Sequence, residues 1–173
     1  MYIRPNFDKV LKQALYIIAI AFICGVVNNL LFARIPWFGS WSPKVLPSGI
    51  TVPPSYEEGK DAPVINLSEA MTAYNSGGAI FLDARTMEDY KAGHIKGAIQ
   101  LYMEEFEVEY AEVKDLLPKD ALIITYCGGD ECELSLFLTR NLKAEGFTNL
   151  KVFFGGWQEW VEAKLPTSTG ENP

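Results

Sequence analysis

Cys127 and Cys132 stand at the two ends of a short polar loop whose composition and spacing suit thiol chemistry. The residues between them are Gly128, Gly129, Asp130 and Glu131. The apolar run Ala121–Tyr126 precedes the loop, and a segment with helical periodicity follows it. In open α/β sheets, ligands bind beyond the carboxyl ends of strands, and a helix N-terminus stabilises an anion there through its N–H groups and its dipole. A thiol at that point is favoured as the thiolate, so the spacing predicts a nucleophilic Cys127.

Cys127 also has a purely structural interpretation, because free cysteines are often buried as small hydrophobic residues. Gly128 and Gly129 favour the functional one, since they let the backbone curl round the sulfur without Cβ clashes. The chain has three cysteines, too few for a disulfide framework. It has one histidine, His94, and no Cys/His pair at the spacing of a structural zinc site, so neither a metal nor a cofactor is expected.

The elements that must position the loop alternate from Val64 onward. Apolar runs predict strands over 79–83, 121–126 and 150–154. Helices are predicted over 69–75, 104–117, 133–145 and 157–163. Predicted caps are Ser68 and Gly77 around the first helix, Thr86 with Asp89 before a further one, and Gly146 after the third. Alternating strands and helices predict an α/β fold, a mainly parallel sheet with helices on both faces.

The N-terminal region contains 20 residues without a charge, Ala14–Ala33. As a helix at about 1.5 Å per residue, this run spans about 30 Å, the thickness of a bilayer's hydrocarbon core. A cleaved signal peptide would have a shorter apolar run and a small-x-small site, which Leu31-Phe32-Ala33 matches poorly. A buried core helix is rarely apolar all round at this length. The run therefore predicts a transmembrane helix over 14–33, after a short tail over 1–13.

Charge is distributed unevenly along the chain. Residues 1–54 hold five basic residues and one acidic residue, and residues 55–173 hold 10 basic and 21 acidic ones. Basic residues before the apolar run favour a cytoplasmic N-terminus and an exported C-terminal domain, on the periplasmic side in a bacterium. The acidic domain lacks the electrostatic footprint of a nucleic-acid partner.

Prolines divide the chain further. Six prolines between Pro36 and Pro63 oppose helix and central strand, so residues 34–63 are predicted to be a semi-extended linker. The globular domain is predicted over 64–166, followed by a C-terminal tail over 167–173.

Three segments of this domain together resemble a single rhodanese domain. They are LDARTMEDYKAGHIKGAIQL from Leu82 to Leu101, ITYCGGDEC around Cys127, and VFFGGWQEW from Val152 to Trp160. The resemblance implies a three-layer rhodanese-like fold and a sulfurtransferase. In that family the loop cysteine takes a sulfur atom from a donor, holds it as a persulfide and passes it to an acceptor thiol or cyanide.

On this resemblance Cys127 is the sulfur carrier. The N–H groups of the loop that follows, Gly128 through Cys132, would bind the terminal sulfur of the persulfide. Asp83 and Arg85 would sit beside the loop and help to fix its shape. The partners implied are a sulfur donor and a thiol acceptor or reductant.

The loop departs from the family pattern in its charge. Many active rhodaneses have Arg or Lys after the cysteine and Arg at the end of the loop, where this sequence has Gly128 and Cys132. Asp130, Glu131 and Glu133 add negative charge, so a dianion such as thiosulfate would meet weak attraction or repulsion. Phosphate-ester hydrolysis needs the missing Arg still more, which argues against a phosphatase.

Cys132 leaves three functions open. It could resolve a persulfide on Cys127 and release sulfide as a disulfide forms. The two cysteines could instead form the redox pair of a thiol–disulfide oxidoreductase. Cys132 also has a structural interpretation, as a small residue at the start of the helix. A third hypothesis is a non-catalytic rhodanese-like module that docks a membrane protein partner. His94 lies in the family's Gly-His-Ile segment and is predicted to be structural.

Overall fold

The computed structural model describes residues 7–33, 42–129 and 132–171. The chain forms two compact units, Met1–Ser40 and Trp41–Pro173. The first contains α1 (Phe7–Asn28), which continues as a π-helical turn, η1 (Asn29–Ala33). Among the described residues one helix, Asp8–Leu31, is long and apolar enough to cross a membrane. Most of its large apolar side chains are exposed.

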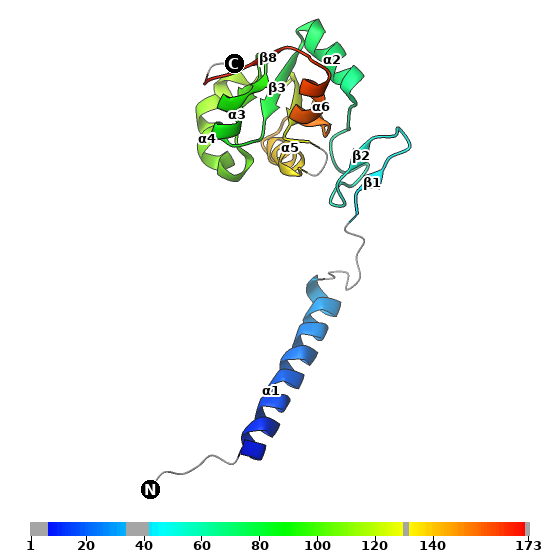
Figure 1. The fold of residues 1–173 in the computed structure, drawn as a ribbon, viewed down its shortest axis with the longest axis vertical. Coiled ribbons are helices and arrows are strands. Elements are labelled where there is room, and N and C mark those ends of the chain that lie inside the picture. Colours follow the sequence, from blue (N-terminus) through cyan, green and yellow to red (C-terminus); the bar gives the residue numbers. More distant parts are fainter. Residues whose placement is uncertain (1–6, 34–41, 130–131, 172–173) are drawn as a thin grey trace. The chain divides into compact units, whose positions relative to one another are not determined.

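A four-stranded parallel sheet forms the centre of the second unit (Figure 1). Its strands are β3 (Ala79–Asp83), β5 (Ile99–Gln100), β6 (Leu122–Tyr126) and β7 (Leu150–Phe153), in the order β5-β3-β6-β7. Asp83 pairs with Tyr126 at the carboxyl ends of the two central strands. The loop that begins at Cys127 therefore leaves the middle of the sheet at its ligand-binding edge.

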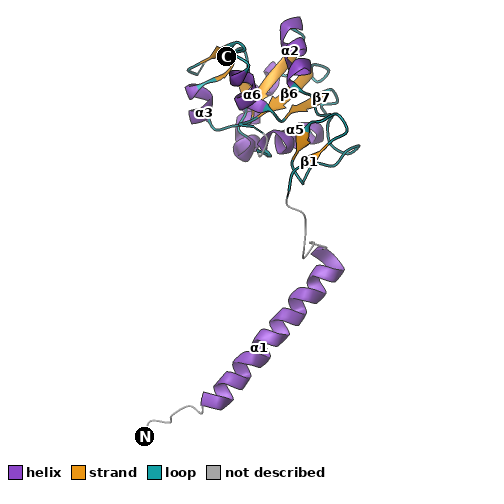
Figure 2. Ribbon diagram, turned by 45° about the vertical axis from the view of Figure 1, so that its right-hand side comes forward, coloured by secondary structure: helices purple, strands orange, loops and turns teal. Residues whose placement is uncertain are grey.

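Helices cover both faces of the sheet (Figure 2). They are α4 (Phe106–Val113) and α5 (Leu134–Ala144) on one face, and α2 (Leu67–Ser76) and α6 (Gly156–Glu162) on the other. Alternate strand residues point to the two faces, so Leu82 and Ile123 join one buried cluster while Phe81 and Ile124 join the other. These three layers confirm the predicted α/β class with a parallel sheet.

Smaller elements complete the unit. They are a hairpin of β1 (Lys44–Val45) and β2 (Thr51–Val52), α3 (Met87–Ala92), an antiparallel pair of β4 (His94–Ile95) and β8 (Thr167–Ser168), and 3₁₀ turns η2 (Met103–Glu105) and η3 (Lys114–Leu116). The two 3₁₀ turns flank α4, so the helix predicted over 104–117 is α-helical only in its middle.

One predicted helix cap was wrong. Helix α2 is capped by Asn66 and not by Ser68. Asn66 Oδ1 accepts a hydrogen bond from the Glu69 N–H, and Glu69 Oε2 accepts one from the Asn66 N–H, both at 2.9 Å. This capping box satisfies two backbone donors at the start of the helix. Gly77 closes the helix in the left-handed region at φ 66°, as predicted. Thr86 caps α3 by accepting from the Asp89 N–H, also as predicted.

The segment before Pro63 packs on the domain. The sequence predicts a spacer over 34–63, but its described part contains the β1–β2 hairpin, and Val52, Tyr56 and Ala62 are buried in the same cluster as α5. The apolar residues between the prolines account for this packing, because their burial removes apolar surface from water.

A charged pair fastens this segment to α5. Arg140 donates to both carboxylate oxygens of Asp61 at 2.8 Å and to the Ser55 carbonyl at 2.8 Å. The hydrogen bond from Arg140 lowers the pKa of Asp61 below its ordinary value of 3.8. The pair therefore stabilises the fold above that value, and this stabilisation is lost as the pH falls through the lowered pKa.

Replacing Asp61 with Asn should reduce the free energy of unfolding at neutral pH by about 1 kcal/mol. Denaturant unfolding from pH 7 downward should show this difference shrinking below about pH 4. Glu57→Gln is the matched control, because the Glu57–Lys60 pair is exposed on both sides and should contribute nothing measurable. An Asp61→Asn deficit that does not change with pH would contradict the ionic explanation.

Candidate active site

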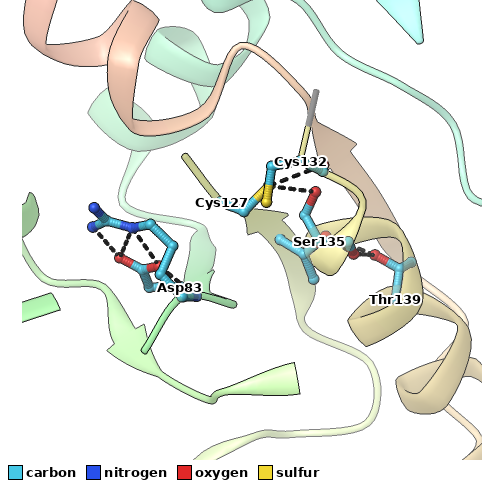
Figure 3. The surroundings of a disulfide bond; sticks show 7 residues. Asp83, Cys127, Cys132, Ser135 and Thr139 are labelled. Atoms are coloured by element: carbon cyan, nitrogen blue, oxygen red, sulfur yellow. Dashed lines mark hydrogen bonds and ion pairs between the residues drawn. A yellow bond between two sulfur atoms is a disulfide. The ribbon is translucent and has the colours of Figure 1, made fainter. Parts of the chain in front are cut away.

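Cys127 directly follows β6 and is completely buried. The structure joins it to Cys132 in a disulfide, with the two Cα atoms 6.2 Å apart (Figure 3). The side chain of Cys132 is partly exposed. The two cysteines singled out from the sequence are thus brought together, and Cys132 is the more exposed residue of the two.

The loop is held by the first turn of α6. The Trp157 N–H donates to the Cys127 carbonyl at 2.8 Å, and the Gln158 N–H donates to the Gly128 carbonyl at 3.0 Å. Gly156 makes this approach possible, because a Cβ on it would collide with the Cys127 carbonyl oxygen, and its φ of 55° lies in the left-handed region. The Gly-Gly turn after β7 therefore fixes the path of the backbone at Cys127.

Two oxygen atoms face the sulfur of Cys127. The Cys132 carbonyl oxygen lies 3.0 Å from Sγ, and Ser135 Oγ lies 3.5 Å from it. The Cys132 N–H donates to the Gly129 carbonyl at 2.9 Å, so this amide is not directed at the sulfur as the family resemblance implied. Of the other predicted loop residues, Gly128 and Gly129 lie in the described loop, and Asp130 and Glu131 lie outside the described residues.

Three buried hydroxyl groups support the loop from behind. Thr125 Oγ1 and Thr139 Oγ1 lie 2.6 Å apart, so one of these hydroxyls donates to the other. The second donates to the Ser135 carbonyl oxygen, which lies 2.9 Å from Thr125 Oγ1 and 2.7 Å from Thr139 Oγ1. All three residues are almost completely buried. This network ties β6 to the first turn of α5, where Ser135 stands beside Cys127 (Figure 3).

Asp83 and Arg85 form a buried ion pair. Asp83 lies on the side of Cys127 away from Ser135 (Figure 3). Arg85 donates to Asp83 Oδ2 at 2.6 Å and to the Gly93 carbonyl at 2.7 Å, and its guanidinium lies 5.1 Å from the Trp157 ring centroid. Arg85 thus touches the residue whose N–H binds the Cys127 carbonyl. Burial first, and then the negative charge of Asp83, raise the pKa of neighbouring Tyr126 well above its ordinary value, which keeps that hydroxyl neutral.

Glu133 follows Cys132 and connects the end of the loop to the segment before the domain core. Its Oε1 accepts from the Ser55 hydroxyl at 2.6 Å. Its carboxylate leaves a negative charge at the end of the loop, where the sequence has no Arg or Lys from 127 to 135.

His94 is buried, stacks on Tyr90 at 3.7 Å between ring centroids, and its Nδ1 lies 2.8 Å from the Tyr90 carbonyl oxygen. These contacts suit the predicted structural role. Among the described residues no group of three His, Cys, Asp or Glu could hold a metal ion.

The sequence reasoning missed Ser135, Thr125 and Thr139. A signal was present: Ser135 and Thr139 stand four residues apart on the same stripe of the helix as Leu138 and Leu142, and Thr125 interrupts an apolar strand. Polar residues at core positions need hydrogen-bond partners, and here those partners lie beside Cys127.

A protein-family model described as a rhodanese-like domain matches residues 66–163. An HTH-type transcriptional regulator from Mycobacterium tuberculosis is 31% identical over 112 residues, which cover 65% of this chain and 47% of that protein. Human thiosulfate:glutathione sulfurtransferase is 28% identical over 112 residues, which cover 58% of this chain and 95% of that protein. The chain spans less than half the length of the M. tuberculosis regulator and of the matching tRNA uridine(34) hydroxylases.

Solved structures show the same fold. The BH2092 protein from Bacillus halodurans superimposes with a TM-score of 0.56 and 25% identity, over 64% of this chain and 79% of that one. A human single-domain sulfurtransferase superimposes with a TM-score of 0.50 and 26% identity, over 58% of this chain and 96% of that one.

Proposed function

Since this chain belongs to the rhodanese-like domain family, we propose that it is a membrane-tethered sulfurtransferase that carries sulfane sulfur as a persulfide on Cys127. The observation that carries the proposal is the position of Cys127 after β6, with the carbonyl of that residue fixed by the first turn of α6. The proposal is also supported by relatives that align over nearly their whole length and are named as sulfurtransferases.

The proposed reaction has two displacements. The Cys127 thiolate attacks the outer sulfur of a persulfide donor, the donor leaves as a thiolate, and Cys127 gains one sulfur atom. An acceptor thiolate then attacks that outer sulfur and releases the Cys127 thiolate. No net oxidation occurs, because one sulfane sulfur moves between thiols.

The charge of the loop favours a particular donor. The loop sequence contains Asp130 and Glu131 and no basic residue, and Glu133 follows it, so a thiosulfate dianion gains little attraction on its approach. A neutral or singly charged hydropersulfide avoids most of this cost. We therefore place persulfides of small thiols or of proteins ahead of thiosulfate as donors, although thiosulfate stands in the names of two relatives.

The disulfide supports a second step, in which Cys132 resolves the persulfide. The Cys132 thiolate attacks Sγ of Cys127, hydrosulfide leaves, and the Cys127–Cys132 disulfide forms. Two equivalents of a thiol reductant then return the pair to the dithiol and are themselves oxidised to a disulfide. Without a sulfur donor, the same pair would make the protein a thiol–disulfide oxidoreductase, which is the second candidate function.

The tether is proposed to be the apolar helix within residues 14–33, with a cytoplasmic N-terminus and the domain on the exported side. Lys9 and Lys12, which precede the uncharged run from Ala14, support this orientation. An oxidising compartment would favour the disulfide that the structure contains. A membrane protein is then a natural partner, since the domain would be confined to the bilayer surface.

Intact-mass measurement of the full chain in detergent tests the proposal. The Cys24→Ser protein, reduced and then incubated with a small-thiol persulfide, should gain one sulfur atom on Cys127. A disulfide that forms without any sulfur-loaded species would favour the oxidoreductase. No change at either cysteine with small-molecule or protein persulfides would leave the non-catalytic docking module as the better hypothesis.

Replacing Cys132 with Ser should leave sulfur loading of Cys127 intact and stop sulfide release. We expect the release rate to fall by more than about a hundredfold, because attack across the loop has a far higher effective concentration than attack by an outside thiol. Sulfide trapping together with intact mass would show the persulfide accumulating. Unchanged sulfide release in Cys132→Ser would contradict the resolving role and leave simple persulfide carriage.

A further inference from the structure

We propose that the hydroxyl group of Ser135 donates a hydrogen bond to the Cys127 thiolate and replaces the positive charge that the loop lacks. The inference rests on the proposed use of Cys127 as the sulfur carrier, and it names the residue that makes this sulfur a competent nucleophile and leaving group. Ser135 Oγ lies 3.5 Å from Cys127 Sγ, within hydrogen-bonding distance for sulfur (Figure 3).

The direction of this hydrogen bond follows from chemistry. A thiolate and a disulfide sulfur have no hydrogen to donate, so Ser135 must be the donor in both states. The Cys132 carbonyl oxygen, 3.0 Å from the same sulfur, favours a protonated thiol and opposes the anion. Cys127 therefore needs a donor close by, and Ser135 supplies one within the buried site.

The position of Ser135 is fixed by groups that do not touch the sulfur. Its carbonyl accepts from the hydrogen-bonded pair of Thr125 and Thr139 hydroxyls, which ties this turn of α5 to the strand that precedes Cys127. A hydroxyl held in this way loses little further entropy when it binds the anion. Because the site is buried, the hydrogen bond is not weakened by competition with water.

Charged groups near the sulfur do not supply the missing donor. On the elements packed around Cys127, Asp83 and Arg85 are paired with one another, Tyr126 is kept neutral by burial, and Glu133, Glu159 and Glu162 are acidic. The two basic residues of α5 are directed elsewhere: Arg140 pairs with Asp61, and Lys143 donates to the Lys60 carbonyl. Asp130 and Glu131 lie outside the described residues and add only acid. Arg85 is directed to Asp83 and Gly93, so it does not substitute for a cation in the loop.

The Ser135 hydroxyl also assists reduction of the Cys127–Cys132 disulfide. Cys132 is the more exposed partner, so an outside thiolate attacks Cys132 Sγ and forms a mixed disulfide there. The bond between the two cysteines breaks, and Cys127 leaves as a thiolate that the Ser135 hydroxyl stabilises. A lower leaving-group pKa makes this exchange faster.

The test is the pKa of the Cys127 thiol, measured from the pH dependence of iodoacetamide alkylation on the full chain in detergent. Cys24→Ser and Cys132→Ser leave Cys127 as the reacting thiol. Adding Ser135→Ala should raise this pKa by about one, and below the pKa the alkylation rate constant should fall about tenfold. Thr139→Ala, which loosens the same turn but keeps the Ser135 hydroxyl, should raise the pKa by clearly less than Ser135→Ala does.

A pKa that does not change in Ser135→Ala, or that rises equally in Thr139→Ala, would overturn the inference. If Ser135→Ala fails to fold, as judged by circular dichroism, the parent protein itself tests the inference: with the donor present the Cys127 pKa should lie below its ordinary value of about 8.5 despite burial, and a pKa at or above that value would overturn the inference. The measurement uses no sulfur donor, so it is separate from the test of sulfur transfer. A protein that never takes up sulfur but shows the Ser135-dependent pKa would contradict the proposed function alone.

Discussion

Replacing Cys127 with Ser should abolish sulfur uptake by this chain. The serine hydroxyl is not ionised at neutral pH, so the buried position after β6 would hold no nucleophile, and loss of such a group reduces turnover by at least about a thousandfold. The measurement is transfer from a persulfide donor to a thiol acceptor, followed both as product formation and as sulfur bound to the protein. We expect both signals to fall to the level without protein.

Cys132→Ser is the matched control for this change. Either substitution removes the disulfide, whose short loop contributes about 2 kcal/mol under oxidising conditions. Both variants should therefore lose the same free energy of unfolding when oxidised and neither should lose any when reduced. Only Cys127→Ser should lose sulfur uptake. Uptake that persists in Cys127→Ser and disappears in Cys132→Ser would reverse the two roles.

Much of the fold could be predicted because its strands are buried on both faces. Such strands are continuous apolar runs, which is why the predicted limits of β3 are those observed and those of β6 and β7 differ by one residue. The cap of α2 could not be assigned as easily, because Asn66 and Ser68 are both good capping residues. Asn66 is the cap because Glu69, three residues later, completes a capping box with it.

Less of the site could be predicted, because its support comes from residues distant in the sequence. Cys127 and Cys132 are recognisable from their loop alone. The contact between Ser55 and Glu133 joins residues 78 positions apart, and nothing in either local sequence indicates it. The linker prediction missed this packing because prolines exclude regular structure but do not prevent burial.

Replacing Gly156 with Ala should disable the site without touching either cysteine. The added Cβ would collide with the Cys127 carbonyl oxygen, and the φ of 55° is unfavourable for any residue with a Cβ. The backbone conformation costs about 1–2 kcal/mol and the collision a similar amount, so we expect about 3 kcal/mol less stability. Because the loop must move to relieve the collision, sulfur transfer should fall about a hundredfold even where the protein remains folded. Denaturant unfolding measures the loss of stability. Transfer rates measured at denaturant concentrations well below the unfolding midpoint give the loss of activity separately.

Gly77→Ala separates the backbone strain from the displacement of the loop. Gly77 has a φ of 66°, close to that of Gly156, but a Cβ on Gly77 would meet no atom within 4 Å. This variant should lose about 1 kcal/mol of stability and keep its transfer rate, because the end of α2 is far along the chain from the Cys127–Cys132 loop. Gly156→Ala could instead behave like Gly77→Ala, with a small loss of stability and full transfer. That result would show that the contact between the Gly-Gly turn and the Cys127 carbonyl does not hold Cys127 in position. If Gly156→Ala alone lost transfer, the position of Cys127 would depend on α6 as well as on the strand that carries it.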